Sequence, residues 1–177
     1  ASVQSPAGVA LAGKYGSSVL TITRPRDPGA PESDLAALWT VAEESAAEHN
    51  KVVNRDDWRL VIPVHIAETR KEAFAQARLG AGRYQAEYFE HTMGRDPVID
   101  GPPEKIIDAM VDNGTWIIGD PDDCLRYLEQ YAPTGVDEIM PLFQIGPMAH
   151  QEVMETLRLF GKHVIPNLSQ SDQTTSA

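Results

Sequence analysis

The sequence has few features that would tie the protein to a disulfide, a membrane or a nucleic acid. Cys124 is the only cysteine, so neither an intrachain disulfide nor a cysteine-based metal site can form. No apolar run approaches the roughly 20 residues that span a bilayer. No basic segment followed by an apolar stretch marks a secretion signal near the start. These absences favour a cytoplasmic protein, in which Cys124 is a small buried side chain.

Positive charge is also scarce. The chain has 15 Lys and Arg residues against 26 Asp and Glu, and its net charge is −11. Nucleic acids and anionic membrane surfaces select for clusters of basic residues, so we expect neither as a partner. The same acidity keeps a protein soluble.

What remains is the composition of an ordinary globular protein. Hydrophobic residues make up 42% of the 177 residues and charged residues 23%, which is enough for one domain with a core. Residues 169–177 are polar and contain no large apolar side chain. We therefore expect one domain over residues 1–168, followed by a disordered tail over residues 169–177.

Helical and strand patterns alternate along the chain, which predicts an α/β fold with parallel strands. Strands are expected at residues 17–22, 58–66 and 137–143, and the first residues have the character of a strand's end. Pro63 counts against a regular central strand at 58–66 and suggests a bulge. Three parallel strands cannot close a barrel. The sheet is therefore either small and open or a piece of a larger one, and the start without Met favours the piece.

Helix starts are marked by capping residues. Ser33 is expected to cap a helix that runs to about residue 49, and Thr69 and Glu72 form a capping box that opens a helix towards Tyr88 or His91. Further helices are expected over residues 103–111 and from about residue 150. Asp120 precedes Pro121, Asp122 and Asp123 and should cap a helix that runs to about residue 131. Capping explains these three carboxylates better than a metal does, and we expect no metal site.

Three stretches together match one known pattern. The first comprises residues 1–8 (ASVQSPAG) and 12–16 (AGKYG), and the second is 58–69 (WRLVIPVHIAET). The third begins with IGDPDD at 118–123, continues to residue 144, and ends with LRLFGKHVIP at 157–166. In order and in spacing they resemble the bacterial luciferase-like family of flavin-dependent monooxygenases, over nearly the whole chain except its tail.

This resemblance implies a fold and a chemistry. The chain would be the C-terminal part of a TIM (β/α)8 barrel, with about three strands and their helices. Members of the family bind reduced FMN at the barrel mouth and insert one oxygen atom from O₂ into a hydrophobic organic substrate. The reduced flavin commonly comes from a separate reductase, and a homo-oligomer is expected.

Two alternatives stay open. One is a deazaflavin-dependent dehydrogenase of the same superfamily, and the other is a non-catalytic fragment that self-associates through exposed sheet edges.

The best candidate site is the segment Gln4, Ser5, Pro6, Ala7 and Gly8. In the family the matching loop holds the flavin phosphate at a helix N-terminus. Unpaired N–H groups and the positive end of a helix dipole favour a phosphate there, the Ser5 hydroxyl adds a donor, and Gly8 allows close approach. An ordinary Ser-Pro helix cap is the alternative. Gln4 is the weaker candidate, because the family often has an acidic or other polar residue at this place.

Other residues have weaker or structural interpretations. His65 lies near the end of its strand, where barrel enzymes place functional groups, but a core histidine with its hydrogen bonds satisfied is favoured. We expect Trp39, Trp58 and Trp116 to be packing residues. Gln144 and Met148 follow the last strand and are placed near the flavin by position alone. For Tyr88, Phe89 and His91 the sequence does not decide whether they reach a substrate. The family's active-site histidine comes from strands absent here, so no catalytic residue is named and the chain is expected to be inactive alone.

Overall fold

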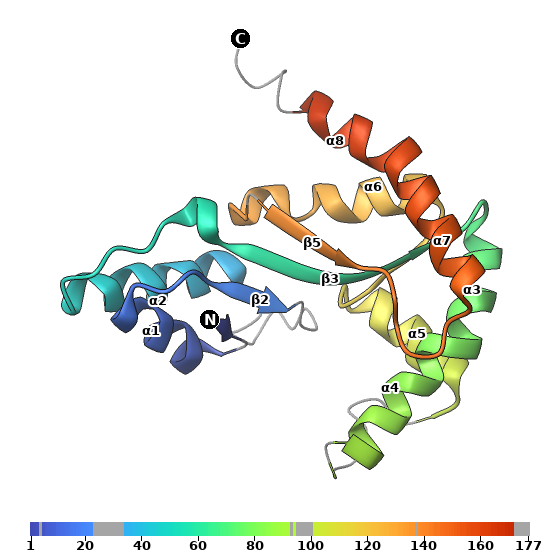
Figure 1. Ribbon diagram of the computed structural model, residues 1–177, viewed down its shortest axis with the longest axis horizontal. Coiled ribbons are helices and arrows are strands. Elements are labelled where there is room, and N and C mark those ends of the chain that lie inside the picture. Colours follow the sequence, from blue (N-terminus) through green and yellow to red (C-terminus); the bar gives the residue numbers. More distant parts are fainter. Residues whose placement is uncertain (4, 23–33, 93, 95–100, 137, 172–177) are drawn as a thin grey trace. The chain divides into compact units, whose positions relative to one another are not determined.

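The computed structural model describes residues 1–3, 5–22, 34–92, 94, 101–136 and 138–171 (Figure 1). Where the sequence predicts one domain, the chain divides into two compact units. The first unit comprises Ala1–Ile62, Asn113–Thr115 and Gln130–Pro141. The second unit comprises Pro63–Asp112, Trp116–Glu129 and Leu142–Ala177.

Parallel strands organise the first unit. Strand β1 (Ser2–Val3) pairs with β2 (Leu20–Ile22), and β2 pairs with the beginning of β3 (Arg59–Ile66). Strand β5 (Glu138–Leu142) also pairs with β3. All three expected strands are present. Strand β2 is shorter than the predicted 17–22, β3 begins one residue after the predicted 58–66, and β5 is shorter than the predicted 137–143. The strand end expected at the first residues is confirmed as β1.

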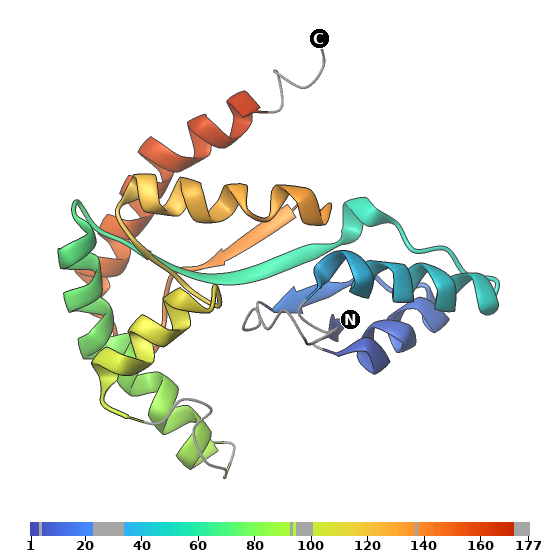
Figure 2. The ribbon, with the colours of Figure 1, turned by 180° about the vertical axis from the view of Figure 1, so that it is seen from behind.

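Two helices of the first unit lie side by side (Figure 2): α1 (Pro6–Tyr15) and α2 (Leu35–Glu48). A Cβ atom on Gly13 would overlap the carbonyl oxygen of Ala42, so the two backbones approach at a place that only glycine allows. Asp34 caps α2, its carboxylate accepting from Ala37 N at 3.1 Å. The cap expected at Ser33 is therefore corrected by one residue; Ser33 itself lies outside the described residues.

Stacked tryptophans form part of this unit's core. The rings of Trp39 and Trp58 stack with centroids 5.0 Å apart, and the guanidinium of Arg55 lies 5.5 and 5.7 Å from them. Arg55 also donates to the carbonyl of Gly135 at 2.8 Å, and Trp58 Nε1 donates to Thr21 Oγ1 at 2.9 Å. With Trp116 also buried, in the second unit, the packing role expected for the three tryptophans is confirmed.

The second unit begins within β3, whose later residues pair in parallel with β4 (Ile117–Gly119). The sequence analysis missed β4, because three residues are too few to show a strand's periodicity. Strand β3 continues through Pro63 without the expected bulge. Its registered pairs with β2 end at Val61 and those with β4 begin at Val64, so the missing N–H of Pro63 falls between them.

Helices surround these strands. A continuous helical path runs through α3 (Arg70–Ala77), a π-turn (Arg78–Gly82), α4 (Arg83–Glu87) and a second π-turn (Tyr88–Thr92), as the capping box at Thr69 predicts. Helices α5 (Pro103–Asp112) and α6 (Pro121–Glu129) also match the predictions.

The last helical path comprises α7 (His150–Leu159), a π-turn (Phe160–Val164) and α8 (Ile165–Ser171). Helix α8 ends at Ser171, three residues beyond residue 168, after which the tail was expected to begin. Residues 172–177 lie outside the described part.

Helices α3 and α5 supply half of the core of the second unit, and the strands supply Ile118. The buried members of this core are Ala67, Ala73, Phe74, Ala77, Ala81, Ile106, Ile107, Met110, Val111, Trp116, Ile118, Ile145, Met148 and Val153.

Candidate functional site

The N-terminus of α1 follows directly on β1 and holds four of the five predicted site residues. Ser5 is the N-cap, with extended backbone, and its Oγ accepts from Gly8 N at 3.3 Å. Pro6 occupies the first helical position, where its missing N–H costs nothing. Gln4 lies outside the described residues. The local geometry therefore has the helix cap that the sequence predicts, with Ser5 and Ala7 exposed.

Hydrogen-bonding capacity is left over at this end. A serine hydroxyl that accepts one bond keeps its own hydrogen free to donate. The amide of Ala7 has no acceptor among the described residues, whereas Val9 N donates to Ser5 O at 3.0 Å. A Cβ on Gly8 would meet its nearest atoms at 3.5 Å, which is ordinary contact, so the packing of the chain itself does not require glycine here.

The charge at the start of α1 differs from that at the starts of five other described helices. Helix α1 has no acidic residue in its first turn. Carboxylates stand at those five starts: Asp34 caps α2, and first-turn acids are Glu72 in α3, Glu104 in α5, Asp122 and Asp123 in α6, and Glu152 in α7. Helices α4 and α8 also lack a first-turn acid, but each continues directly from a π-turn. An anion at the positive end of a helix is stabilised by the dipole. At α1 no carboxylate of the first turn fills this role.

The aspartates around α6 cap its N-terminus and form ion pairs. Asp120 Oδ1 accepts from Asp123 N at 2.9 Å, which confirms the predicted cap. Asp123 is buried and pairs with Arg70 at 2.9 Å and with Arg126. A Cβ on Gly119 would overlap the Asp123 side chain, so this turn needs both residues. Among the described residues no three His, Cys, Asp or Glu side chains gather as a metal site would require.

His65 is a fully buried residue of β3 with both ring nitrogens engaged. Nε2 lies 2.8 Å from Gln76 Oε1 and Nδ1 lies 2.9 Å from Thr156 Oγ1. Gln76 Nε2 donates to Glu72, so its Oε1 is the acceptor that faces His65. Burial lowers the pKa of His65, which favours the neutral ring. The prediction of a satisfied core histidine is confirmed.

The remaining candidates divide by exposure. Burial raises the pKa of the Cys124 thiol to about 12, which leaves it an unreactive core residue as expected. Met148 is buried against Gly80 in the core, so its side chain is not available to a cofactor as position alone suggested. Gln144 is exposed, and its Nε2 donates to the carbonyl of Gly146 at 2.7 Å. Its predicted place near a flavin stays a prediction.

Of the three residues left undecided, Tyr88 packs its ring 5.6 Å from that of Tyr84 and His91 is exposed. The side chain of Phe89 lies outside what the structure describes.

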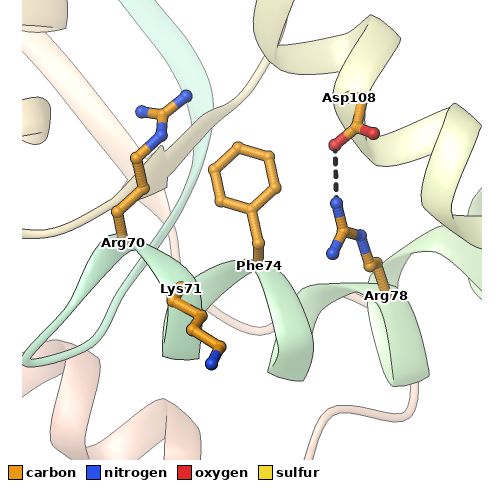
Figure 3. A pocket seen from close by; sticks show the side chains of 5 residues that line it. All are labelled: Arg70, Lys71, Phe74, Arg78 and Asp108. Carbon is orange, nitrogen blue, oxygen red and sulfur yellow. Dashed lines mark hydrogen bonds and ion pairs between the residues drawn. The ribbon is translucent and has the colours of Figure 1, made fainter.

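One feature escaped the sequence analysis. Three residues of α3, the first residue of the π-turn after it and one residue of α5 line an open pocket of about 530 Å³ (Figure 3): Arg70, Lys71, Phe74, Arg78 and Asp108. The α3 residues recur at helical spacing, which the sequence shows. The ion pair between Arg78 and Asp108 joins residues 30 positions apart, and no local sequence pattern reveals such a tertiary contact.

Comparison with known proteins gives the chain relatives. No family model matches it. A 4-hydroxyprotoasukamycin monooxygenase of Streptomyces nodosus subsp. asukaensis is 34% identical over 174 residues, which cover 96% of this chain and 46% of that protein. Limonene 1,2-monooxygenase of Rhodococcus erythropolis is 38% identical over 120 residues, 67% of this chain and 30% of that protein. The chain thus spans about half the length, or less, of these relatives.

Solved structures share its fold. Monooxygenase RslO1 from Streptomyces bottropensis superposes with a TM-score of 0.71 at 18% identity, covering 94% of this chain and 46% of that one. The oxygenating constituent of 3,6-diketocamphane monooxygenase from Pseudomonas putida, solved with FMN, gives 0.59 at 21% identity, covering 93% and 46%. The coenzyme F420-dependent tetrahydromethanopterin reductase of Methanopyrus kandleri gives 0.54 at 20% identity, covering 94% and 49%.

No described helix combines the length and apolarity that a bilayer crossing needs. Both sequence relatives are monooxygenases that match along 96% and 67% of the chain, and the fold is that of about half of a luciferase-like TIM barrel. The chain belongs to the luciferase-like family of flavin-dependent monooxygenases.

Proposed function

We propose that this chain contributes to a monooxygenase that uses reduced FMN and O₂ to insert one oxygen atom into a hydrophobic small organic molecule. The observation that carries the proposal is 34% identity to a monooxygenase along 96% of the chain. Limonene, named in the other relative, is a hydrocarbon and agrees with a hydrophobic substrate. As further proposals, a separate reductase supplies the reduced flavin, and the protein works as a homo-oligomer.

In this proposal the start of α1 holds the flavin phosphate. The Ser5 hydroxyl donates to a phosphate oxygen while still accepting from Gly8 N, and the Ala7 amide supplies a second donor. Gly8 leaves the backbone open to close approach. When bound, reduced flavin supplies the electrons that activate O₂. The chain's share of the work is to anchor and orient the cofactor.

The test is a fluorescence titration of the purified chain with FMN, with riboflavin as the ligand control. Riboflavin lacks the phosphate, so contacts at α1 should contribute to FMN binding alone. We expect FMN binding in the micromolar range, about −8 kcal/mol, and weaker riboflavin binding.

Ser5→Asp is the decisive variant, because aspartate also caps helices well and the fold should be kept. Its charge beside a dianionic phosphate should weaken FMN binding at least tenfold and leave riboflavin binding unchanged. Ser18→Asp adds the same charge at an exposed residue of the first unit and serves as the matched control. Equal FMN affinity in the native chain and Ser5→Asp, or no FMN binding by the folded chain, would overturn the proposed phosphate site.

The same titration with the deazaflavin F420 separates the two chemistries. Preference for F420 over FMN would favour the dehydrogenase alternative, whose support is a shared fold at 20% identity. A stable oligomer that binds neither would favour the non-catalytic alternative. We expect no turnover of limonene by the 177-residue chain with a reductase and NADH, because half a barrel cannot enclose the reaction from water. Formation of an oxygenated product would contradict that expectation.

A further inference from the structure

The pocket on α3 gathers positive charge in an acidic protein. Its lining has three cationic side chains, Arg70, Lys71 and Arg78, and one carboxylate, Asp108. The whole chain by contrast carries a net charge of −11. Figure 3 shows Arg70 and Arg78 on either side of Phe74 and Asp108 facing Arg78, while the side chain of Lys71 extends from the same helix away from these four.

The two guanidinium groups are held in place before any ligand arrives. Arg70 pairs with Asp123 at 2.9 Å, and Arg78 pairs with Asp108 at 2.9 Å. Both also lie over the Phe74 ring, at 4.7 and 5.5 Å from its centroid. Contact with an aromatic face and a carboxylate fixes a long side chain, so little rotamer entropy is lost when another group binds it.

Donors remain unused in this arrangement. Each guanidinium has five N–H donors, and its ion pair with the neighbouring aspartate engages one nitrogen. Arg78 Nε is buried without an acceptor among the described residues. Lys71 is exposed, and its ammonium forms no ion pair within the part of the chain that the structure describes. The pocket therefore offers positively charged hydrogen-bond donors, and a ligand that carries negatively charged acceptors would complement it.

We propose that this pocket binds a small organic anion through a carboxylate or phosphate group. Guanidinium groups match the planar fork of these oxyanions, and Lys71 adds a mobile charge. Phe74 offers the apolar surface for the body of the ligand, and about 530 Å³ suits a small molecule. The anion would share Arg78 with Asp108, so Asp108 opposes binding. This site lies in the second unit and does not depend on the proposed flavin function.

The experiment is isothermal titration calorimetry of the full chain with benzoate and with inorganic phosphate at low salt, where charge interactions are least screened. We expect benzoate, phosphate or both to bind, and to move the amide signals of α3 and α5 in NMR spectra. Which of the two binds more tightly identifies the oxyanion. Lys71→Gln should weaken binding about threefold to tenfold, as loss of a partly exposed charge contact does.

Asp108→Asn gives the sharper test. If the ion pair between Arg78 and Asp108 only held the pocket together, its loss would weaken anion binding, whereas the proposal predicts stronger binding. Removing the opposing carboxylate should strengthen binding severalfold. Arg158→Gln is the matched control: it removes one positive charge and one surface ion pair, with Glu155, outside the pocket lining, and should change nothing. The proposal is overturned if neither anion binds, or if Lys71→Gln and Arg158→Gln weaken binding equally, which indicates an ion atmosphere only.

The anion-binding test and the FMN titration can refute their two proposals independently of each other. Ser5→Asp should leave benzoate binding unchanged, and Lys71→Gln should leave the difference between FMN and riboflavin unchanged. If Lys71→Gln instead abolished the FMN preference, the pocket on α3 would be the phosphate site and the assignment to α1 would be wrong.

Discussion

Thr156→Val tests whether a single hydroxyl joins α7 to β3 in the second unit. Thr156 is fully buried, and its Oγ1 lies 2.9 Å from His65 Nδ1, 2.7 Å from Ile66 O and 3.2 Å from Ile66 N. Valine has nearly the same shape, so the substitution removes hydrogen bonds without opening a cavity. Each buried polar group left without a partner costs about 1–3 kcal/mol. With His65 and the backbone of Ile66 both affected, we expect a loss of about 2–4 kcal/mol in the free energy of unfolding.

Thr40→Val is the matched control, because it changes the same atoms at an exposed position. The Thr40 hydroxyl donates to Ala36 O within α2, at 3.2 Å, and its loss should stay within about 0.5 kcal/mol. Urea unfolding followed by circular dichroism and by tryptophan fluorescence measures both. Because the chain has two compact units, the two signals show whether they unfold together. A loss in Thr156→Val no larger than that in Thr40→Val would refute the reasoning.

Two further predictions concern stability. Burial lowers the pKa of His65 below its unfolded value of about 6.5, so the unfolded chain takes up a proton first and stability falls as pH drops below 6.5, by at most about 1.4 kcal/mol per pH unit. Urea midpoints between pH 7.5 and 5.5 should fall less in His65→Gln, and an unchanged slope would contradict the assignment. Gly13→Ala should cost about 1–3 kcal/mol by forcing α1 away from Ala42, whereas Gly161→Ala, with no atom within 4 Å, should be neutral or stabilising; equal thermal shifts would show that this helix contact is not tight.

Features set by neighbouring residues could be predicted from the sequence. The caps at Ser5, Thr69 and Asp120 all form, because a side chain that bonds an amide three residues ahead needs no tertiary information. Strand β3 was visible because eight largely apolar residues give a strong signal. Strand β4 was not, since three buried residues next to a cap resemble the approach to a helix.

Contacts between distant segments could not be predicted. A buried His65 was expected, but its partner Thr156 lies 91 residues away, and only the packing of α7 brings the two together. The position of Met148 after the last strand suggested a cofactor contact, whereas a close approach to Gly80 makes it a core residue. The pocket on α3 depends in the same way on where α5 places Asp108.

The glycines of α1 show how structural and functional demands can be told apart within one helix. Gly13 is required by the fold, because any side chain there would overlap the backbone of α2. Gly8 is not, because a Cβ would meet Ser5 and Val3 at 3.5 Å, and glycine inside a helix costs about 1 kcal/mol relative to alanine. The corresponding residue, three after the cap, is Glu72 in α3 and Asp123 in α6, where the carboxylate fills the positive helix end. In the proposed phosphate site, Gly8 has a role that packing does not give it, because it leaves that helix end uncharged and lets a negatively charged ligand approach the backbone.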